Sequence, residues 1–382
     1  MSWLSYLSRK TSSSRFIPEI DGLRFIAIIT VVLFHLNSAL AKESGLGLSN
    51  ALMDMGGSKH MFSLAWWWVR LDLGVKLFFA ISGFVLALPF LRYQMGLSDK
   101  SVDLKSYFTR RLTRLEPPFI ISLIGFYLLH TFLLDANYLE YLKHLAAGII
   151  YGHVFIFGEA NPINSVSWSL ETEAQFYLLV PVLFYLSSVF GNGKQGIRML
   201  AFALVVFLSV FFKKRFIWDP YLNRSIFCYF MNFAMGIMSC WYYLKYPRWF
   251  KERKYVFDLL GLAAFFGMFY FYKPQHHYQN IIFFNLSIFF TVVAAFKGRL
   301  LNHFYSRKWI YTIGGMCYSI YLLHYALFHA SVKLSRATWV DDWTYTTNLI
   351  LHILPQLFLV LLVSSIFYIL FERPFMQRER KK

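Results

Sequence analysis

The sequence predicts an all-α polytopic membrane protein in which about ten transmembrane helices form one bundle and both termini are cytoplasmic. Of its 382 residues, 57% are hydrophobic and 15% are charged, whereas soluble domains contain about 25% charged residues. Uncharged runs recur along the chain and are long enough to cross a hydrocarbon core of about 30 Å, which needs about 20 helical residues. Lys and Arg are distributed unevenly among the segments that connect these runs. Together these observations exclude a water-soluble fold.

Ten helices are predicted to span the membrane. Their expected bounds are 24–41, 73–91, 117–134, 169–190, 198–213, 225–245, 256–272, 279–296, 309–331 and 348–371. The second, fifth and seventh have short apolar cores, which long side chains at the helix ends can extend. We expect the third to begin at Pro117 and Pro118, because a missing N–H costs least at a helix start. With no internal repeat, residues 1–382 are predicted to be a single domain with cytoplasmic tails at 1–17 and 372–382.

The distribution of Lys and Arg decides the orientation. With the N-terminus inside, the inner segments hold 25 of the 38 Lys and Arg residues and the outer loops hold 11, as the enrichment of basic residues in cytoplasmic loops requires. An eleventh span at 144–158 would give 16 inside and 20 outside. We therefore expect this stretch to be re-entrant or packed on the outer face, within a long outer segment at 135–168. The same rule accounts for the net charge of +18, so nucleic-acid binding is not predicted.

The chain carries no other targeting or metal signal. Residues 1–18 lack an apolar core and a small-residue cleavage site, so no signal peptide is predicted. All three cysteines fall within apolar runs and are expected to be buried apolar side chains. The pair His276-His277 has no further ligand nearby in the sequence. No metal site is predicted.

Arg24 and His35, in the first predicted span, are the first candidates for chemistry. Eleven positions separate them, which is almost three helical turns, so they share one helix face about 16 Å apart. Ionisable side chains within a membrane usually face a cavity or a partner. Imidazole has the ordinary pKa best suited to a general base near neutral pH. The alternative is a structural histidine that hydrogen-bonds to a neighbouring helix.

Arg111 and Arg114 lie one helical turn apart, just before the third span. Guanidinium groups bind phosphates in bidentate geometry, so the pair is a candidate site for the phosphates of a nucleotide-like cofactor. The alternative is an ordinary cytoplasmic anchor, which charge alone favours.

Glu171 and Glu173 lie where the outer segment enters the fourth span. Acidic side chains suit a helix N-terminus, so both could simply complement the helix dipole. Glu173 and Tyr177 are four residues apart and share one face. A carboxylate at this position has the chemistry to orient a histidine or to accept a hydrogen bond from a sugar hydroxyl.

Two further segments combine small residues with polar ones. Gly314 and Gly315 precede an aromatic stripe that includes Tyr318 and Tyr321, and Ser82 adjoins a glycine in the second span. Small residues allow a helix or a ligand to approach closely. On pattern alone, the aromatic stripe favours packing over binding.

These ordered motifs resemble the acyltransferase family 3 of membrane proteins, which acylates cell-surface polysaccharides and other acceptors. The matching segments are Asp21-Gly-Leu-Arg24 with His35, Phe78–Phe84, Arg111–Arg114 with its prolines, Trp168–Tyr177, Tyr318–His324 and Phe371–Phe375. Each segment alone is a weak signal. Six of them in this order, across the whole chain, are specific.

The resemblance implies ten helices in a bacterial inner membrane and an acyl-CoA donor that enters from the cytoplasm. The acyl group, acetyl in most of the family, would pass to a carbohydrate or lipid-linked glycan at the outer face, where 135–168 is a candidate for handling the acceptor. By analogy, His35 is assigned as general base or acyl-relay residue and Arg24 as its electrostatic support. Glu173 is assigned as an acceptor contact or supporting residue.

The donor side follows from the same analogy. Arg111 and Arg114 become contacts for acyl-CoA, and Ser82 and Tyr318 are placed with them. Acyl-CoA is a substrate here, and no permanently bound cofactor is predicted.

Two departures from the family pattern leave alternatives open. The family usually has two adjacent acids before the glutamine of its third motif, whereas this chain has Glu173-Ala174, so Glu171 remains a candidate. Many relatives carry a fused esterase-like domain, whereas this chain stops at Lys382, so we expect direct acylation or transfer through a separate acyl-accepting protein. A transporter or flippase of a lipid or glycolipid is the alternative function, because polar residues would also line a transport path.

Overall fold

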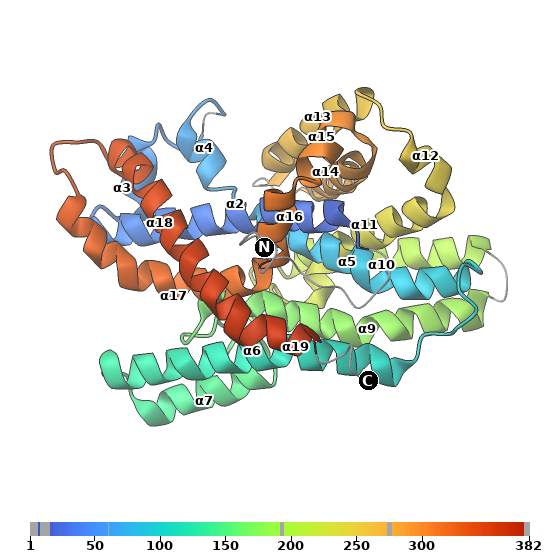
Figure 1. Ribbon diagram of the computed structural model, residues 1–382, viewed down its shortest axis with the longest axis horizontal. Coiled ribbons are helices and arrows are strands. Elements are labelled where there is room, and N and C mark those ends of the chain that lie inside the picture. Colours follow the sequence, from blue (N-terminus) through green and yellow to red (C-terminus); the bar gives the residue numbers. More distant parts are fainter. Residues whose placement is uncertain (1–6, 8–15, 60, 192–194, 273–276, 378–382) are drawn as a thin grey trace.

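A computed structural model describes residues 7, 16–59, 61–191, 195–272 and 277–377, and within these residues every regular element is helical (Figure 1). The long helices are α2 (Pro18–Glu43), α5 (Leu73–Gln94), α6 (Leu104–Leu133), α7 (Tyr138–Ile149), α9 (Trp168–Gly191), α10 (Gln195–Arg215), α11 (Ile226–Lys245), α13 (Val256–Tyr272), α14 (Tyr278–Lys297), α17 (Cys317–Ser335) and α18 (Tyr345–Phe367). The short elements are α3 (Gly47–Asp54), α4 (Leu64–Trp68), α8 (His153–Phe157), η1 (Ser165–Ser167), α12 (Pro247–Lys251), α15 (Arg299–Tyr305), α16 (Lys308–Gly315), η2 (Arg336–Thr338), η3 (Tyr368–Glu372) and α19 (Arg373–Gln377).

The described helices are those of a multi-pass membrane protein. Six segments are long and apolar enough to cross a membrane: Pro18–Glu43, Leu64–Gln94, Leu104–Phe132, Ser165–Val189, Tyr278–Lys297 and Tyr345–Met376. The other four predicted spans are also helical, but they do not belong to this set. The all-α membrane class is confirmed, whereas the number of ten spans and the cytoplasmic position of both termini remain predictions.

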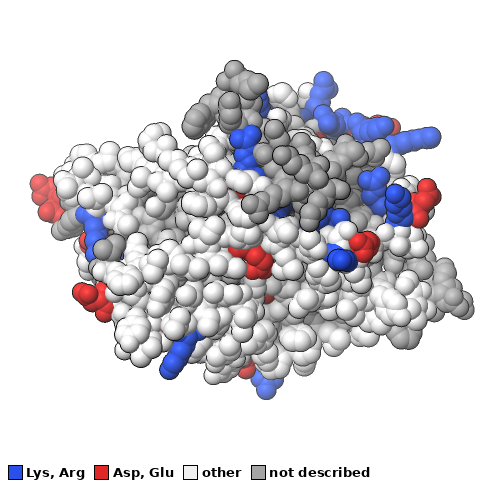
Figure 2. Space-filling view, turned by 60° about the horizontal axis from the view of Figure 1, so that its bottom comes forward, with Lys and Arg blue, Asp and Glu red and all other residues white. Residues whose placement is uncertain are grey.

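Charge is distributed unevenly over the surface. Figure 2 shows a face that is largely uncharged: many Lys and Arg side chains lie toward the upper right, others lie at the left and lower edges, and a small acidic cluster lies near the centre. Large apolar side chains such as Leu178, Phe207 and Leu354 are exposed on the helices. An exposed apolar belt of this kind suits contact with lipid.

Close helix packing places α2, α5 and α11 at the centre of the bundle (Figure 1). A Cβ atom on Gly83 would overlap the backbone of Phe233, and one on Gly236 would overlap the backbone of Ala80. Only glycine permits backbones to approach so closely. Phe79 stacks on Phe233 at this crossing, with 4.7 Å between ring centroids. The prediction that small residues bring helices together is therefore confirmed in the second span.

The prediction that Pro117 and Pro118 start a helix is wrong. Helix α6 begins at Leu104, where the Asp103 side chain accepts hydrogen bonds from two backbone N–H groups, and both prolines lie inside the helix. The acidic cap fixes an earlier start. Proline is tolerated inside membrane helices, and the Tyr318 hydroxyl donates to the Leu115 carbonyl in the turn that precedes the prolines.

The predicted span 309–331 is also wrong as one helix, because it breaks at Met316 between α16 and α17. Gly314, just before the break, packs against the backbone of α2, and glycine lowers helix stability. After the break, the Glu372 carboxylate accepts hydrogen bonds from the N–H and hydroxyl of Ser319. A carboxylate at the first turn stabilises a new helix start.

The segment 135–168 folds into two helices, α7 and α8, and the single turn η1. Helix α7 lies beside α6 (Figure 1). A turn with a positive φ of 55° at Tyr151 separates α7 from α8. Neither helix has the roughly 20 residues that a span needs, which agrees with the rejection of an eleventh span at 144–158.

The predicted cytoplasmic tails lie partly outside the described residues. Of the tail 1–17, only residues 7, 16 and 17 are described, and His276 lies outside the described residues as well. At the other end, Glu372 belongs to the π-helical turn η3 and is fully buried, and α19 continues to Gln377. The part of 372–382 that is described is therefore packed helix.

Candidate active site

His35 in α2 faces His324 in α17, with 3.0 Å between His35 Nδ1 and His324 Nε2. His324 is fully buried, whereas His35 keeps a partly exposed edge. The two helices pack side by side. Tyr325 lies edge-to-face against His35, with 5.4 Å between ring centroids. The fold therefore pairs two imidazoles that are 289 residues apart in the sequence.

Hydrogen bonding assigns the protons of this pair. His324 Nδ1 lies 3.1 Å from the Ile320 carbonyl oxygen and 2.9 Å from that of Tyr321. A carbonyl only accepts, so Nδ1 of a neutral His324 carries the hydrogen and its Nε2 is an acceptor. His35 must then donate from Nδ1 to His324 Nε2. The remaining nitrogen, His35 Nε2, has an unprotonated lone pair, which is what a general base requires.

Two ionisable groups interact electrostatically with His35. The Asp72 carboxylate and the His329 imidazole both interact electrostatically with His35. Asp72 itself accepts from the Tyr272 hydroxyl and from Lys76 Nζ. His35 therefore lies next to a negatively charged group that is already held by two donors.

Arg24 pairs with Asp21 one turn earlier in α2. Its guanidinium also interacts electrostatically with Cys317, at the start of α17, and with Glu173 in α9. Arg24 of the first motif and Glu173 of the third motif therefore interact electrostatically in the folded protein. The spacing of the motifs in the sequence does not predict this interaction.

Glu173 and Glu171 have different surroundings. Glu173 Oε1 accepts from the Ser82 hydroxyl at 2.5 Å, and the Tyr177 hydroxyl also hydrogen-bonds to Glu173. Glu171 Oε2 instead accepts from the backbone N–H of Val154 in α8 at 2.9 Å. Glu173 therefore belongs to the group of interacting residues in the bundle interior, and Glu171 holds the segment that contains α8.

Arg111 lies against aromatic rings near the same group. Its guanidinium is 3.6 Å from the Tyr107 ring centroid and 5.8 Å from that of Tyr177, and Nη1 donates to the Tyr107 carbonyl at 2.7 Å. Among the described residues, Nε of Arg111 and Nε of Arg114 are buried without a hydrogen-bond partner. Buried unpaired donors are costly, and a phosphate oxygen is an acceptor that would satisfy them.

Tyr318 and Tyr321 connect α17 to its neighbours. The Tyr318 hydroxyl donates to the Leu115 carbonyl in α6, beside the arginine pair. The Tyr321 hydroxyl donates to the Val166 carbonyl and lies 2.7 Å from Ser169 Oγ. Both therefore serve packing, as the pattern predicts, and Tyr318 does so next to the proposed donor site.

The remaining candidates for chemistry are the cysteines and the residue types that bind metals. Cys228 and Cys240 are buried, Cys317 is partly exposed, and none of the three forms a disulfide. Within the described ranges, no three His, Cys, Asp or Glu side chains are placed to hold a metal.

Sequence reasoning missed His324 as the hydrogen-bond partner of His35, although an ionisable residue within an apolar span is a signal that could have identified it.

Comparison with known proteins gives one family. Residues 17–369 match the family model described as "Acyltransferase domain". The peptidoglycan O-acetyltransferase OatA of Listeria monocytogenes is 22% identical over 366 residues, which cover 88% of this chain and 53% of the relative. The O-acetyltransferase OatA of Staphylococcus aureus is 26% identical over 343 residues, covering 83% and 51%. The chain thus spans about half the length of these relatives. No solved structure matches.

Proposed function

This chain belongs to the acyltransferase family whose model it matches, and from that premise we propose that it is an O-acyltransferase of a bacterial inner membrane. It transfers an acyl group, expected to be acetyl, from acyl-CoA on the cytoplasmic side to a hydroxyl of a carbohydrate or glycoconjugate at the outer face. The names of the similar O-acetyltransferases support acetyl as the group and a glycan as the acceptor.

The observation that carries the proposal is the hydrogen-bonded pair of His35 and His324. The carbonyls of Ile320 and Tyr321 orient His324, which in turn orients His35. A base that is oriented through one nitrogen, with a lone pair on the second nitrogen and a partly exposed position, is the arrangement that general-base catalysis requires.

The chemical step uses His35 as the proton carrier. His35 Nε2 takes the proton of the acceptor hydroxyl as the hydroxyl oxygen attacks the thioester carbonyl carbon. The tetrahedral intermediate collapses with cleavage of the carbon–sulfur bond, and the proton on His35 passes to the departing CoA sulfur. The products are the O-acyl ester and free CoA. Hydrogen bonding from Nδ1 to His324 stabilises the imidazolium that forms between these two proton transfers.

Arg111 and Arg114 are the groups that we assign to the phosphates of acyl-CoA. Their buried unpaired Nε atoms support this role, and stacking on Tyr107 limits the freedom of Arg111. Glu173, held by Ser82 and Tyr177, is assigned to position Arg24 between the donor side and the histidines. Tyr318 supports the arginine-bearing part of α6 through the Leu115 carbonyl.

The test is release of free thiol from acetyl-CoA by the purified full chain in lipid nanodiscs, with and without added membrane glycolipid. We expect thiol release with the glycolipid present and formation of an O-acetyl ester in equal amount. His35→Ala should reduce both by a factor of about 10² to 10⁴, the range attributed to general acid–base catalysis.

The matched control is His303→Ala, which removes an exposed histidine on α15 and should leave the rate unchanged. If the wild type released no thiol with glycolipid but moved glycolipid between leaflets, the enzyme assignment would be wrong and the transporter correct. A fully active His35→Ala protein would remove His35 from the mechanism.

A further inference from the structure

A small polar cavity lies where α5, α10, α11 and α14 meet. It is lined by Lys76, Ser209, Lys213, Cys228, Tyr229, Met231, Asn232, Ile281, Phe284 and Asn285. The space open to the centre of a water molecule is about 20 Å³, which holds one or two waters or the head of a small charged group. Two lysines inside an otherwise apolar bundle need an explanation, because an ionisable side chain in a membrane is costly and usually functional.

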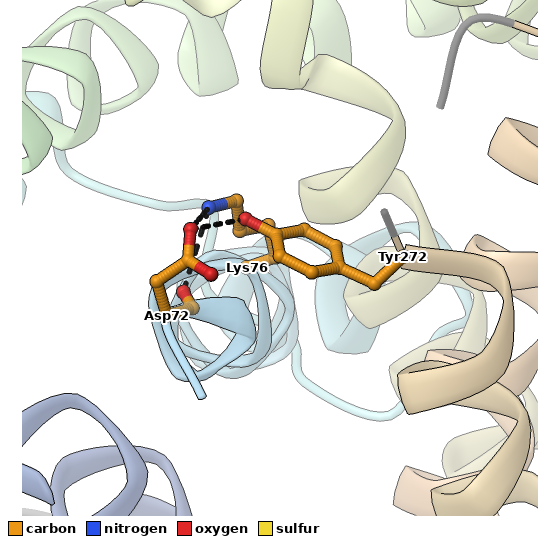
Figure 3. Close-up of polar contacts among 3 residues, drawn as sticks. All are labelled: Asp72, Lys76 and Tyr272. Atoms are coloured by element: carbon orange, nitrogen blue, oxygen red, sulfur yellow. Dashed lines mark hydrogen bonds and ion pairs between the residues drawn. The ribbon is translucent and has the colours of Figure 1, made fainter. Parts of the chain in front are cut away.

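One of these lysines is neutralised within the protein. Lys76 is buried, and its Nζ lies 3.2 Å from Asp72 Oδ2, the oxygen that also accepts from the Tyr272 hydroxyl (Figure 3). Nζ also lies 4.8 Å from the centroid of the Tyr272 ring. Asp72 and Tyr272 thus compensate the Lys76 charge.

The other lysine has no carboxylate partner. Among the described residues, Lys213 forms no ion pair, and its Nζ lies 4.2 Å from the centroid of the Tyr229 ring. The nearby Asp219 carboxylate instead accepts from the backbone N–H groups of Tyr221 and Leu222. Within the described residues, no carboxylate oxygen lies within ion-pair distance of Lys213 Nζ, and the face of the Tyr229 ring alone offsets little of its charge.

The neutral lining also presents donors. Ser209 Oγ accepts from the Met231 N–H at 3.0 Å, so its own hydrogen remains available to an acceptor in the cavity. Asn232 Nδ2 donates one hydrogen to Asn285 Oδ1 at 2.8 Å and keeps a second. Asn285 is itself fixed by donating to the Ile281 carbonyl. A cation with two such neighbours is a site for an anion.

Asp72 and helix α5 connect the cavity to the proposed active site. Asp72 interacts electrostatically both with His35 and with Lys213. Helix α5, which carries Lys76, packs directly on α2, which carries His35. An anionic group held by Lys213 would therefore bring the rest of its molecule next to the histidine pair.

We propose that this cavity binds an anionic group, a carboxylate or a phosphate, on the acyl acceptor, so that the enzyme selects acidic carbohydrates. This inference rests on the proposed acyltransferase function. Lys213 supplies the charge, Ser209 and Asn232 supply hydrogen bonds, and the acceptor hydroxyl is left facing His35.

The experiment uses the full chain in nanodiscs with acetyl-CoA and three oligosaccharides of one length. One contains a hexuronate, the second carries a hexose phosphate, and the third is the neutral hexose counterpart. The variants are Lys213→Met, which removes the charge, and Lys213→Arg, which keeps it. The control is Lys214→Met, because Lys214 is exposed, lies over the Tyr278 ring and does not line the cavity.

We expect the wild type to prefer an acidic oligosaccharide to the neutral one by about tenfold or more in kcat/KM, the size of one hydrogen bond to a charged group. Lys213→Met should abolish this preference by raising KM for the acidic oligosaccharide. Lys213→Arg and the control Lys214→Met should both show the preference of the wild type. The hexuronate and phosphate arms identify which anion is taken. An active Lys213→Met protein with the preference intact would overturn the inference and leave the acyltransferase function standing.

A binding measurement keeps the two proposals separable. Glucuronate and inorganic phosphate are titrated into wild type and Lys213→Met by calorimetry without acetyl-CoA. Binding to the wild type alone supports the anion site even if no acyl transfer occurs, in which case the proposed function fails by itself. Equal binding to both proteins, or to neither, contradicts the site.

Discussion

The described part of the chain contains two histidine pairs with the same hydrogen-bond pattern and different surroundings. In the first, His35 Nδ1 meets His324 Nε2 at 3.0 Å, and His324 Nδ1 donates to backbone carbonyls. In the second, His144 Nδ1 meets His153 Nε2 at 2.8 Å, and His153 Nδ1 donates to the Glu159 carbonyl. The same argument leaves a free Nε2 on His35 and on His144. Hydrogen bonding alone therefore does not distinguish a base from a structural histidine.

Access and surroundings distinguish the two pairs. His35 has a partly exposed edge and lies near Asp72. His144 and His153 are both buried, and the Phe157 ring covers them with centroid distances of 4.5 and 4.8 Å. A buried pair that is covered by the Phe157 ring can hold α7 against α8, but it is not accessible to a reacting hydroxyl. We therefore assign catalysis to the first pair and stability to the second.

Among the histidines that act as partners in these two pairs, the larger effect is expected from His324. His324→Ala should lower kcat about tenfold or more, because His35 loses the acceptor that orients it, while KM for acetyl-CoA stays unchanged. His324→Gln should restore part of the rate, since an amide oxygen can accept from His35 Nδ1. Steady-state kinetics on folded protein gives both values. A loss of rate that Gln does not restore, together with a lower Tm, would make His324 purely structural.

A smaller effect, on stability, is expected from the second pair. His153→Ala should destabilise the packing of α7 and α8 by about 1–3 kcal/mol, because it leaves the Glu159 carbonyl and His144 without a partner. The acyl-transfer rate per folded molecule should not change. Thermal unfolding in nanodiscs and limited proteolysis within 135–168 measure the first effect. An active-site role would appear instead as a lost rate at unchanged Tm.

The smallest effect is a pH dependence of the same segment. Burial lowers the pKa of His153 below its ordinary value, so the unfolded segment binds a proton more readily than the folded one. The stability contribution is complete above the unfolded pKa of about 6.5 and is lost as the pH falls below it. The hydrogen-exchange protection factors of α7 and α8, corrected for the intrinsic exchange rate at each pH, should therefore fall between about pH 7 and pH 5, and His153→Gln should remove that dependence. An identical pH response in His153→Gln would exclude His153 as the source.

Sequence reasoning predicted much of the fold because apolar runs report membrane helices directly. All ten predicted spans contain helix. The errors occur where a distant or local polar group decides a helix start. Asp103 starts α6 ahead of the prolines, a capping signal that is present in the sequence. The start of α17 depends on Glu372, which lies 53 residues further along the chain and which no local pattern identifies.

The candidate site was predictable as a set of residues and not as an arrangement. Motifs single out Arg24, His35 and Glu173, but periodicity within one helix carries no information about the helix opposite. The partner of His35 and the different contacts of Glu171 and Glu173 therefore come only from tertiary packing. Lys213 lies at the end of the predicted span 198–213, and a lysine at the end of a span looks the same in sequence whether it faces solvent or a cavity.

The most direct test of the account compares His35→Ala with His144→Ala under identical conditions. Each protein is purified in nanodiscs, its folded fraction is measured, and the rate of O-acetyl ester formation from acetyl-CoA is expressed per folded molecule. We expect His35→Ala to lose the reaction with little change in Tm, and His144→Ala to keep the rate while its Tm falls. Equal loss of activity in the two variants, or loss in His144→Ala alone, would contradict the assignment of catalysis to the His35 pair.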